Sequence, residues 1–163
     1  MRIPEELQKM LNEQVKNEIN AGYIYLSMAA WFEAKNLPGF AKWMKAQSKE
    51  ELGHAMKIFD YLYDRGAKVT LLDIPAPESE FNSCLGAFEA ALAHEQSVTK
   101  KFEELYNLSV TLGDTASSVF LQWFINEQVE EEKTAGDVIA RLKLVKEDSA
   151  GMLMLDRLLG ERE

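Results

Sequence analysis

Apolar residues recur at alternating steps of three and four along four long stretches of the chain. This spacing places side chains on one face of an α-helix and is typical of helices that pack as a bundle. Nine glycines and four prolines punctuate the chain and divide it into long blocks without a strand-like period. The pattern predicts helices at about residues 4–35, 39–66, 84–110, 115–145 and 149–159.

Residues at the ends of these blocks support the predicted boundaries. Pro4 suits the first helical position, where its missing N–H is not needed. Asp114 and Ser149 are expected to act as N-caps of the last two helices, because their side-chain oxygens can accept hydrogen bonds from free backbone N–H groups. Gly66 and Gly113 follow the second and third blocks and predict turns there.

The stretch from Ala67 to about Ser83 contains two prolines and is the only long one without a helical period. A second helix of about 28 residues is roughly 42 Å long, and a loop of about 16 residues can span roughly 50 Å. The loop can therefore return along the whole bundle and make the second and third helices parallel, whereas an up-down-up-down bundle would need only a few residues. We predict a single all-α domain over residues 1–163, a four-helix bundle with a long crossover between helices two and three and a short fifth C-terminal helix.

Each predicted helical face is apolar at both ends and polar in the middle. Residues at equal distances from a connecting turn share a level in antiparallel helices, so the polar middles should meet. Buried carboxylates without a partner cost several kcal/mol each and repel one another. Something positive should therefore lie between these residues, which are Glu18, Glu51, His54, Glu95, Gln128 and Glu131.

A pair of divalent cations of intermediate hardness fits this polar layer. Four carboxylates supply a charge that two Fe²⁺ ions would balance, and neutral His54 adds a nitrogen ligand. Glu51 and His54 are three positions apart, so the glutamate can bridge two metals while the histidine binds one. The same ligands also admit Mn²⁺ or Zn²⁺, although a single histidine among oxygen ligands argues against a structural zinc site.

The composition narrows the range of partners. The chain has a formal charge of −9 and no basic block, so neither nucleic acid nor an anionic membrane surface is an expected partner. Cys84 is the only cysteine, which excludes an intrachain disulfide and CxxC chemistry. No apolar run is long enough for a membrane span, and the N-terminus lacks the apolar region of a signal peptide. We expect a cytoplasmic protein.

Several segments resemble the ferroxidase-centre motifs of the non-haem bacterial and archaeal ferritins. They are Glu18 with Tyr25, the run Glu51-Leu52-Gly53-His54, the pair His94-Glu95 and the run from Glu127 to Glu132. Together they are specific, although one ExxH motif alone would be weak. The resemblance, to a family of the ferritin-like superfamily, implies a hollow homo-oligomeric cage of 24 subunits. Such a cage takes up Fe²⁺, oxidises it with O₂ or H₂O₂ and stores ferric oxyhydroxide mineral.

The resemblance also assigns roles to single residues. It implies a first iron bound by Glu18, Glu51 and His54, and a second bound by Glu51, Glu95 and Glu131, with Gln128 in the same shell. Tyr25 would hydrogen-bond near the site and donate an electron, or act only as an aromatic residue of the core whose hydroxyl finds a carboxylate. A possible third iron site corresponds to Glu50, Glu127 and Glu130.

Some positions depart from neighbouring families. Bacterioferritins bind haem through a methionine where this chain has Leu52, so no haem is predicted. Animal ferritins line an iron channel with carboxylates where this chain has Ser118 and Leu121, which leaves the entry route open. Two other functions remain compatible with the same ligands: a di-iron oxidase or peroxidase acting on a small molecule, and a structural bundle that binds an ion without turnover.

Overall fold

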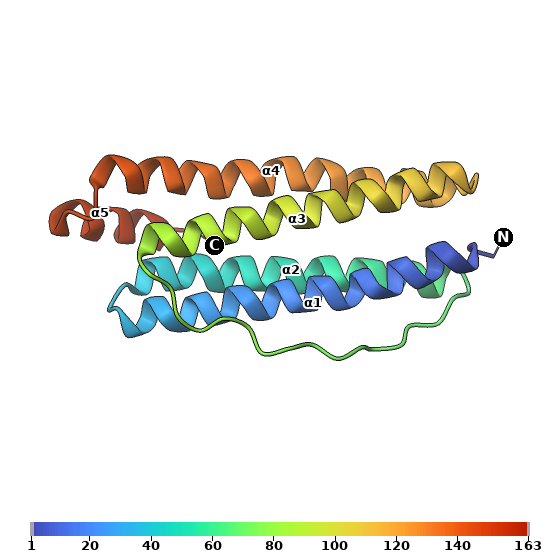
Figure 1. Cartoon of the computed structure of the whole chain (residues 1–163), viewed down its shortest axis with the longest axis horizontal. Coiled ribbons are helices and arrows are strands. Elements are labelled where there is room, and N and C mark those ends of the chain that lie inside the picture. The colour runs from blue at the N-terminus through green and yellow to red at the C-terminus, as the bar shows by residue number, and fades with distance from the viewer. Residues whose placement is uncertain (1, 163) are drawn as a thin grey trace.

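The computed structural model describes residues 2–162, and these residues form five α-helices and no β-strand (Figure 1). The all-α prediction is confirmed. Each helix lies within two residues of the range expected from the sequence pattern. The helices are α1 (Glu5–Ala34), α2 (Pro38–Asp64), α3 (Cys84–Thr111), α4 (Thr115–Val145) and α5 (Ser149–Leu159).

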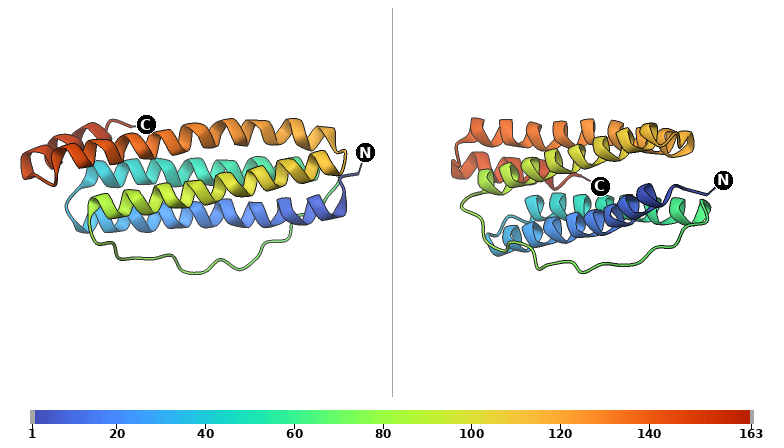
Figure 2. Two further views of the ribbon diagram at one scale, coloured as in Figure 1. Left: turned by 45° about the horizontal axis from the view of Figure 1, so that its top comes forward. Right: turned by 45° about the vertical axis from the view of Figure 1, so that its right-hand side comes forward.

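The four long helices form two antiparallel pairs, α1 with α2 and α3 with α4 (Figures 1 and 2). The crossover of residues 65–83 runs along the outside of the bundle for its whole length, so α2 and α3 are parallel as predicted. Hydrogen bonds fasten this loop to α1. The Asn12 side chain exchanges two bonds of 2.8 Å with the Thr70 backbone, and Ser27 Oγ donates to the Glu78 carbonyl at 2.5 Å.

The helix ends differ from the sequence prediction in three details. Pro4 is the N-cap of α1 rather than its first helical residue. Asp114 stands at the N-cap position of α4 without making a capping bond, because its carboxylate pairs with the Arg65 guanidinium at 2.8 and 3.0 Å. Asp148, not Ser149, caps α5 by accepting a hydrogen bond from the Gly151 N–H at 3.1 Å.

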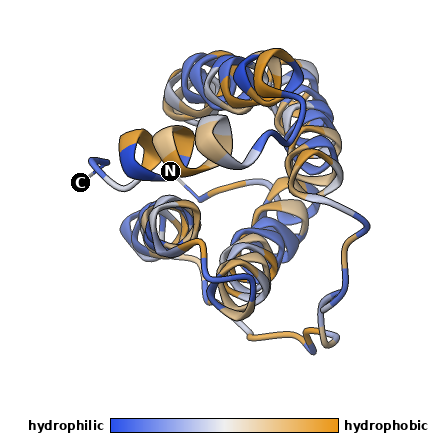
Figure 3. Ribbon diagram, turned by 90° about the vertical axis from the view of Figure 1, so that its left-hand side faces the viewer, coloured by the Kyte–Doolittle hydropathy of each residue, from blue (hydrophilic) through white to orange (hydrophobic). Residues whose placement is uncertain are grey.

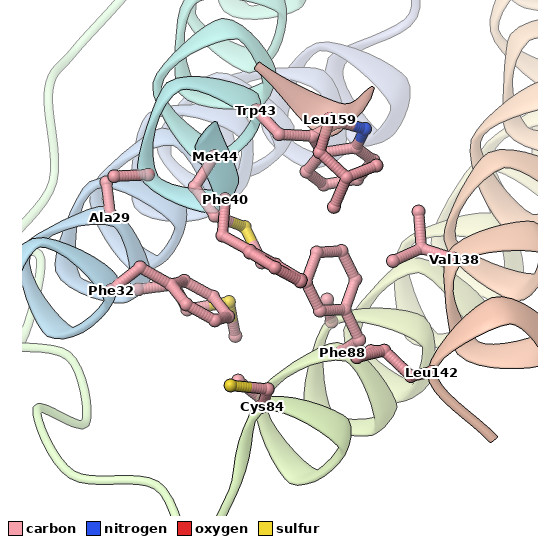
Figure 4. Close-up of a cluster of buried hydrophobic side chains, with 14 of the residues drawn as sticks. Ala29, Phe32, Phe40, Trp43, Met44, Cys84, Phe88, Val138, Leu142 and Leu159 are labelled. Atoms are coloured by element: carbon pink, nitrogen blue, oxygen red, sulfur yellow. The ribbon is translucent and has the colours of Figure 1, made fainter. Parts of the chain in front are cut away.

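Two apolar clusters fill the bundle, one toward each end. Figure 4 shows the cluster near α5, where the Phe32 and Phe40 rings stack with centroids 5.0 Å apart and Phe88 packs against both. At the other end, Phe102 and Phe124 stack at 4.7 Å. The polar middle of each helix lies between these clusters, so packed side chains hold it from both sides.

The predicted buried face is correct along all of α1, correct on α2 and α4 except for half-buried Tyr61 and Val145 near their C-terminal ends, and shifted on α3. The steps of three and four along the sequence place Leu85, Leu92, Thr99 and Tyr106 on the buried face of α3, but these side chains are only half-buried. The fully buried positions of α3 include Ala91, Val98 and Leu105, which lie on the adjoining edge of the same helical stripe. Small residues such as Ala91 carry a weak hydrophobic signal, so the pattern followed their larger neighbours instead.

The fifth helix packs at one end of the bundle against α2 and α4 (Figure 3). Lys146 and Glu147 both adopt positive φ angles, 50° and 59°, which turn the chain sharply after α4. The approach to α2 is so close that a Cβ on Gly39 would lie 1.7 Å from the Asp156 carbonyl oxygen. Asp156 Oδ1 also accepts a hydrogen bond from the buried Phe40 N–H at 2.9 Å, in the first turn of α2, where backbone N–H groups have no partner within the helix.

No helix within residues 2–162 combines the length and the apolar composition needed to cross a lipid bilayer.

Candidate metal centre

The polar residues predicted from the sequence meet at mid-height between the four long helices. Three overlapping groups bring ligand atoms within 4.8 Å of one another: Glu18 with Glu51 and His54; Glu51 with Glu95 and Glu131; and His54 with Glu127 and Glu131. All of these residues are buried except Glu127, which is half-buried. Each long helix therefore supplies at least one carboxylate to a common centre.

The first group has the features of a cation site. Glu18 and Glu51 are fully buried, and the Oε2 atom of each has no hydrogen-bond partner. His54 Nδ1, 3.3 Å from Glu51 Oε2, is also buried without a partner. Leaving three buried polar atoms unpaired is costly. A divalent cation bound by two carboxylate oxygens and one imidazole nitrogen would satisfy all three atoms.

The second group shares Glu51 with the first, which places one carboxylate between two ligand sets. Glu95 is held by two hydrogen bonds: the Tyr25 hydroxyl donates to Oε1 at 2.6 Å and Gln128 Nε2 donates to Oε2 at 3.0 Å. Tyr25 and Gln128 therefore both contact Glu95, a member of the second group. Such partners fix the direction in which a ligating carboxylate points.

The buried carboxylates repel one another, so the electrostatics of the centre favour the binding of cations. Burial, followed by repulsion from the Glu51 carboxylate, raises the pKa of Glu95 to about 8 and that of Glu131 to about 10. The same two causes raise the pKa of Glu18 well above its ordinary range. Burial also acts on the pKa of Glu51, but contacts with His54 and Glu18 and a hydrogen bond from Gln47 outweigh it, and the pKa is lowered. Without a cation, protons neutralise most of the cluster.

The predicted third site is not assembled as one group among the described residues. Glu127 lies near the centre, with Oε1 3.9 Å from His54 Nε2. Glu50 and Glu130 belong to none of the three ligand groups. The Glu50 carboxylate instead forms an ion pair with Arg162, at 3.2 Å.

Two neighbours of the centre were not assigned a role from the sequence. The Trp123 ring stands edge-on to His54, with centroids 5.5 Å apart, and Lys57 Nζ lies 3.6 Å above the Trp123 ring. Gln47 donates hydrogen bonds to Glu51 and Glu131. Its spacing of one helical turn before Glu51 was the available signal, whereas nothing in the local sequence points to Trp123.

The His94 side chain lies outside the three ligand groups. It helps to line a cavity of about 340 Å³ beneath the crossover loop, and its ring centroid is 6.3 Å from that of Tyr25. Burial lowers the pKa of its imidazole. The pair His94-Glu95 therefore sends its two side chains to different surroundings, and only the glutamate joins the centre.

Comparison with known proteins agrees with this architecture. A family model described as the ferritin-like domain matches residues 8–145. The bacterial non-heme ferritin of Staphylococcus saprophyticus is 41% identical over 157 residues, covering 96% of this chain and 94% of the relative. That of Bacteroides fragilis is 39% identical over 162 residues, covering 98% and 99%.

Solved structures give the same result. An open pore ferritin from the archaeon Archaeoglobus fulgidus superposes with a TM-score of 0.98 at 44% sequence identity, covering 99% of both chains. A closed form of the same ferritin, engineered by site-directed mutagenesis, superposes with a TM-score of 0.98 at 45% identity, covering 99% of this chain and 98% of that one.

Proposed function

Because the chain belongs to the ferritin family, we propose that it oxidises and stores iron in the cytoplasm. Fe²⁺ binds at the centre between the four long helices, O₂ or H₂O₂ oxidises it, and the ferric product is stored as oxyhydroxide mineral inside a cage of 24 subunits. The observation that carries the proposal is the pair of buried ligand groups that share Glu51 and leave three polar atoms without partners.

We assign two Fe²⁺ ions to this centre as substrates. Glu18, Glu51 and His54 bind the first, and Glu51, Glu95 and Glu131 bind the second. The four carboxylates balance the charge of the two ions, so binding removes the repulsion that makes the centre costly without metal. Each Fe²⁺ gives up one electron, and holding two ions together lets one oxidant molecule accept two electrons.

Proton movement follows from the same geometry. Glu95 and Glu131 hold protons at neutral pH in the metal-free protein, because their pKa values are about 8 and 10. Binding of Fe²⁺ displaces these protons, so iron uptake releases acid and is favoured as the pH rises. Tyr25 and Gln128 keep Glu95 directed into the centre while its charge changes.

A third iron site remains part of the proposal. Glu127 already lies beside His54, and Glu50 and Glu130 are the other two acidic residues that the family resemblance implies. Arg162 lies 3.2 Å from Glu50 Oε1, so a cation bound by Glu50 would compete with this ion pair. We therefore expect the third site to bind iron more weakly than the two central positions.

The surface of the C-terminal region supports assembly into a cage. Leu144, Leu153, Met154 and Leu158 are exposed, with Met154 75% accessible, and they lie on or beside α5. Apolar side chains gathered in this way favour contact with another subunit. We propose that α5 packs against copies of itself around the four-fold axis of the cage.

The rate of Fe²⁺ oxidation tests the proposal. Glu51→Ala removes the carboxylate shared by both ligand groups and should abolish rapid oxidation measured by stopped-flow absorbance, leaving slow mineral growth. Glu103→Gln changes an exposed glutamate of α3 and serves as the control. Oxidation by Glu51→Ala at the wild-type rate would show that the assigned centre is wrong.

A second experiment must distinguish iron storage from the two alternative functions, a small-molecule oxidase and a structural bundle. A di-iron oxidase acting on a small molecule would stop at the ions held by its ligands, and a structural bundle would bind ions without turnover. Addition of Fe²⁺ in air, in steps well beyond the ligand capacity, should instead give soluble protein-bound mineral that continues to form.

A further inference from the structure

The end of the chain brings an arginine to the edge of the metal centre. Arg162 follows α5 and lies against α2, with its guanidinium 4.3 Å from the centre of the Trp43 ring. One guanidinium nitrogen donates to the Trp43 carbonyl at 3.4 Å. The other donates to Gln47 Oε1 at 2.8 Å and lies 3.2 Å from Glu50 Oε1. With only 18% of its side chain exposed, Arg162 is held by contacts on several sides.

Gln47 stands between this arginine and the ligands. Its side chain is buried, and its Nε2 donates to Glu51 Oε1 at 2.9 Å and also to Glu131 Oε2. Glu51 and Glu131 each belong to two of the three ligand groups. One amide therefore contacts the two carboxylates that link the groups to one another.

The chemistry of these partners allows only one orientation of the amide. A guanidinium has donors and no acceptor, whereas an ionised carboxylate has acceptors and no donor. The Gln47 oxygen must therefore face Arg162, and its NH₂ group must face the ionised Glu51. The same NH₂ group also donates to Glu131. An amide that touched only one kind of partner would be free to turn about its last torsion angle.

We propose that Arg162 is a positioning residue of the metal centre, which acts through Gln47 to hold Glu51 and Glu131 in the direction that binds metal. The inference rests on the proposed function, since it takes these carboxylates to be ligands. It gives the C-terminal segment a role in metal binding in addition to any role in assembly.

Arg162 can affect cation binding in two ways, through its positive charge or through its contact with Gln47, and these two effects can be distinguished. A positive group near four carboxylates disfavours a bound cation, so loss of the charge alone should tighten cation binding. Loss of the positioning contact should weaken it, because the carboxylates lose the partner that directs them. The two explanations predict opposite signs.

The experiment is a titration of the full chain with Co²⁺ alone, followed by its visible absorption bands, which report the ligand geometry. Arg162→Met should lower Co²⁺ affinity roughly tenfold and shift these bands. Arg157→Met removes the same charge from an exposed position of α5 and should stay within about twofold of wild type. If Arg162→Met does not fold, a chain ending at residue 161 makes the same test.

A second variant checks that the effect passes through Gln47. Gln47→Leu should also weaken Co²⁺ binding, and adding Arg162→Met to it should change little further, because residues acting in one chain of contacts are not additive. Unchanged or tighter binding by Arg162→Met, or full additivity with Gln47→Leu, would overturn the proposal. Failure of the wild-type protein to bind Co²⁺ would overturn the proposed function as well.

Discussion

The replacement Glu95→Gln tests the idea that the metal-free centre is held together by protons. Glu95 is buried, and its pKa is raised from 4.5 to about 8, chiefly by burial and then by the Glu51 carboxylate. A glutamine has nearly the shape of a protonated glutamate and can still meet Tyr25 and Gln128. The variant therefore mimics the state that Glu95 occupies below pH 8 and removes the charge that it carries above it.

The sign of the effect follows from the direction of the pKa shift. A raised pKa means that the folded state binds the proton more tightly than the unfolded chain does. This contribution to stability is fully present below pH 4.5 and is lost as the pH rises through about 8. Each pKa unit corresponds to about 1.4 kcal/mol, so the full loss is on the order of 5 kcal/mol and the corresponding change in Tm is roughly 15 °C.

The assay is thermal unfolding of the metal-free protein, followed by circular dichroism at pH 6 and pH 9. The variant should melt higher than wild type at both pH values, with an advantage of roughly 2 kcal/mol at pH 6 and roughly 5 kcal/mol at pH 9, because pH 6 lies between the unfolded pKa of 4.5 and the folded pKa of about 8. Glu103→Gln, an exposed change on the same helix, should melt with wild type at both pH values. Added Co²⁺ at pH 7.5 should raise the Tm of wild type more than that of Glu95→Gln. An advantage for Glu95→Gln at pH 6 as large as that at pH 9 would refute the reasoning.

Three further changes test the fold around the centre. Gly39→Ala places a Cβ against the backbone of α5 and should lower the free energy of unfolding, measured by urea denaturation, by about 2 kcal/mol. The control is Gly136→Ala, which should be neutral or stabilising because a Cβ there has no atom within 4 Å. Asp114→Ala removes the carboxylate that pairs with Arg65 and should cost about 2 kcal/mol in the same measurement. A chain ending at Val145 should keep its helix content but fail to form large particles in size-exclusion chromatography; full-size particles from it would argue against α5 as an assembly element.

The helices and the centre could be predicted because both depend on periodic local signals. Glu18, Glu51, Glu95 and Glu131 interrupt apolar faces at positions that the connecting turns bring to one level, so their meeting follows from helix geometry alone. The register of α3 was less certain, because Ala91 contributes a buried position with little hydrophobic signal. The spacing of residues within one helix predicts the level of a side chain along the bundle. It predicts less well which side of the apolar face is fully buried.

The contacts that the sequence did not reveal join residues far apart in the chain. Arg162 reaches Gln47 only because α5 folds back onto the start of α2, and this approach depends on the missing side chain of Gly39. The prediction of a third iron site depended on a similar long-range contact, because the Glu50 carboxylate forms an ion pair with Arg162, which is distant in the sequence. Such pairings are set by the angle of a short terminal helix, which no periodic pattern specifies.

Iron loading combined with measurement of particle size tests the central claim most directly. Fe²⁺ is added in air to the purified protein in steps far beyond the two or three ions that the ligand groups can hold, and protein and iron are followed together through size-exclusion chromatography. The account predicts that iron elutes with a particle of 24 copies of the 18.5 kDa chain, about 444 kDa, at many ions per subunit. A small oligomer that retains no more iron than its ligands can bind would contradict it.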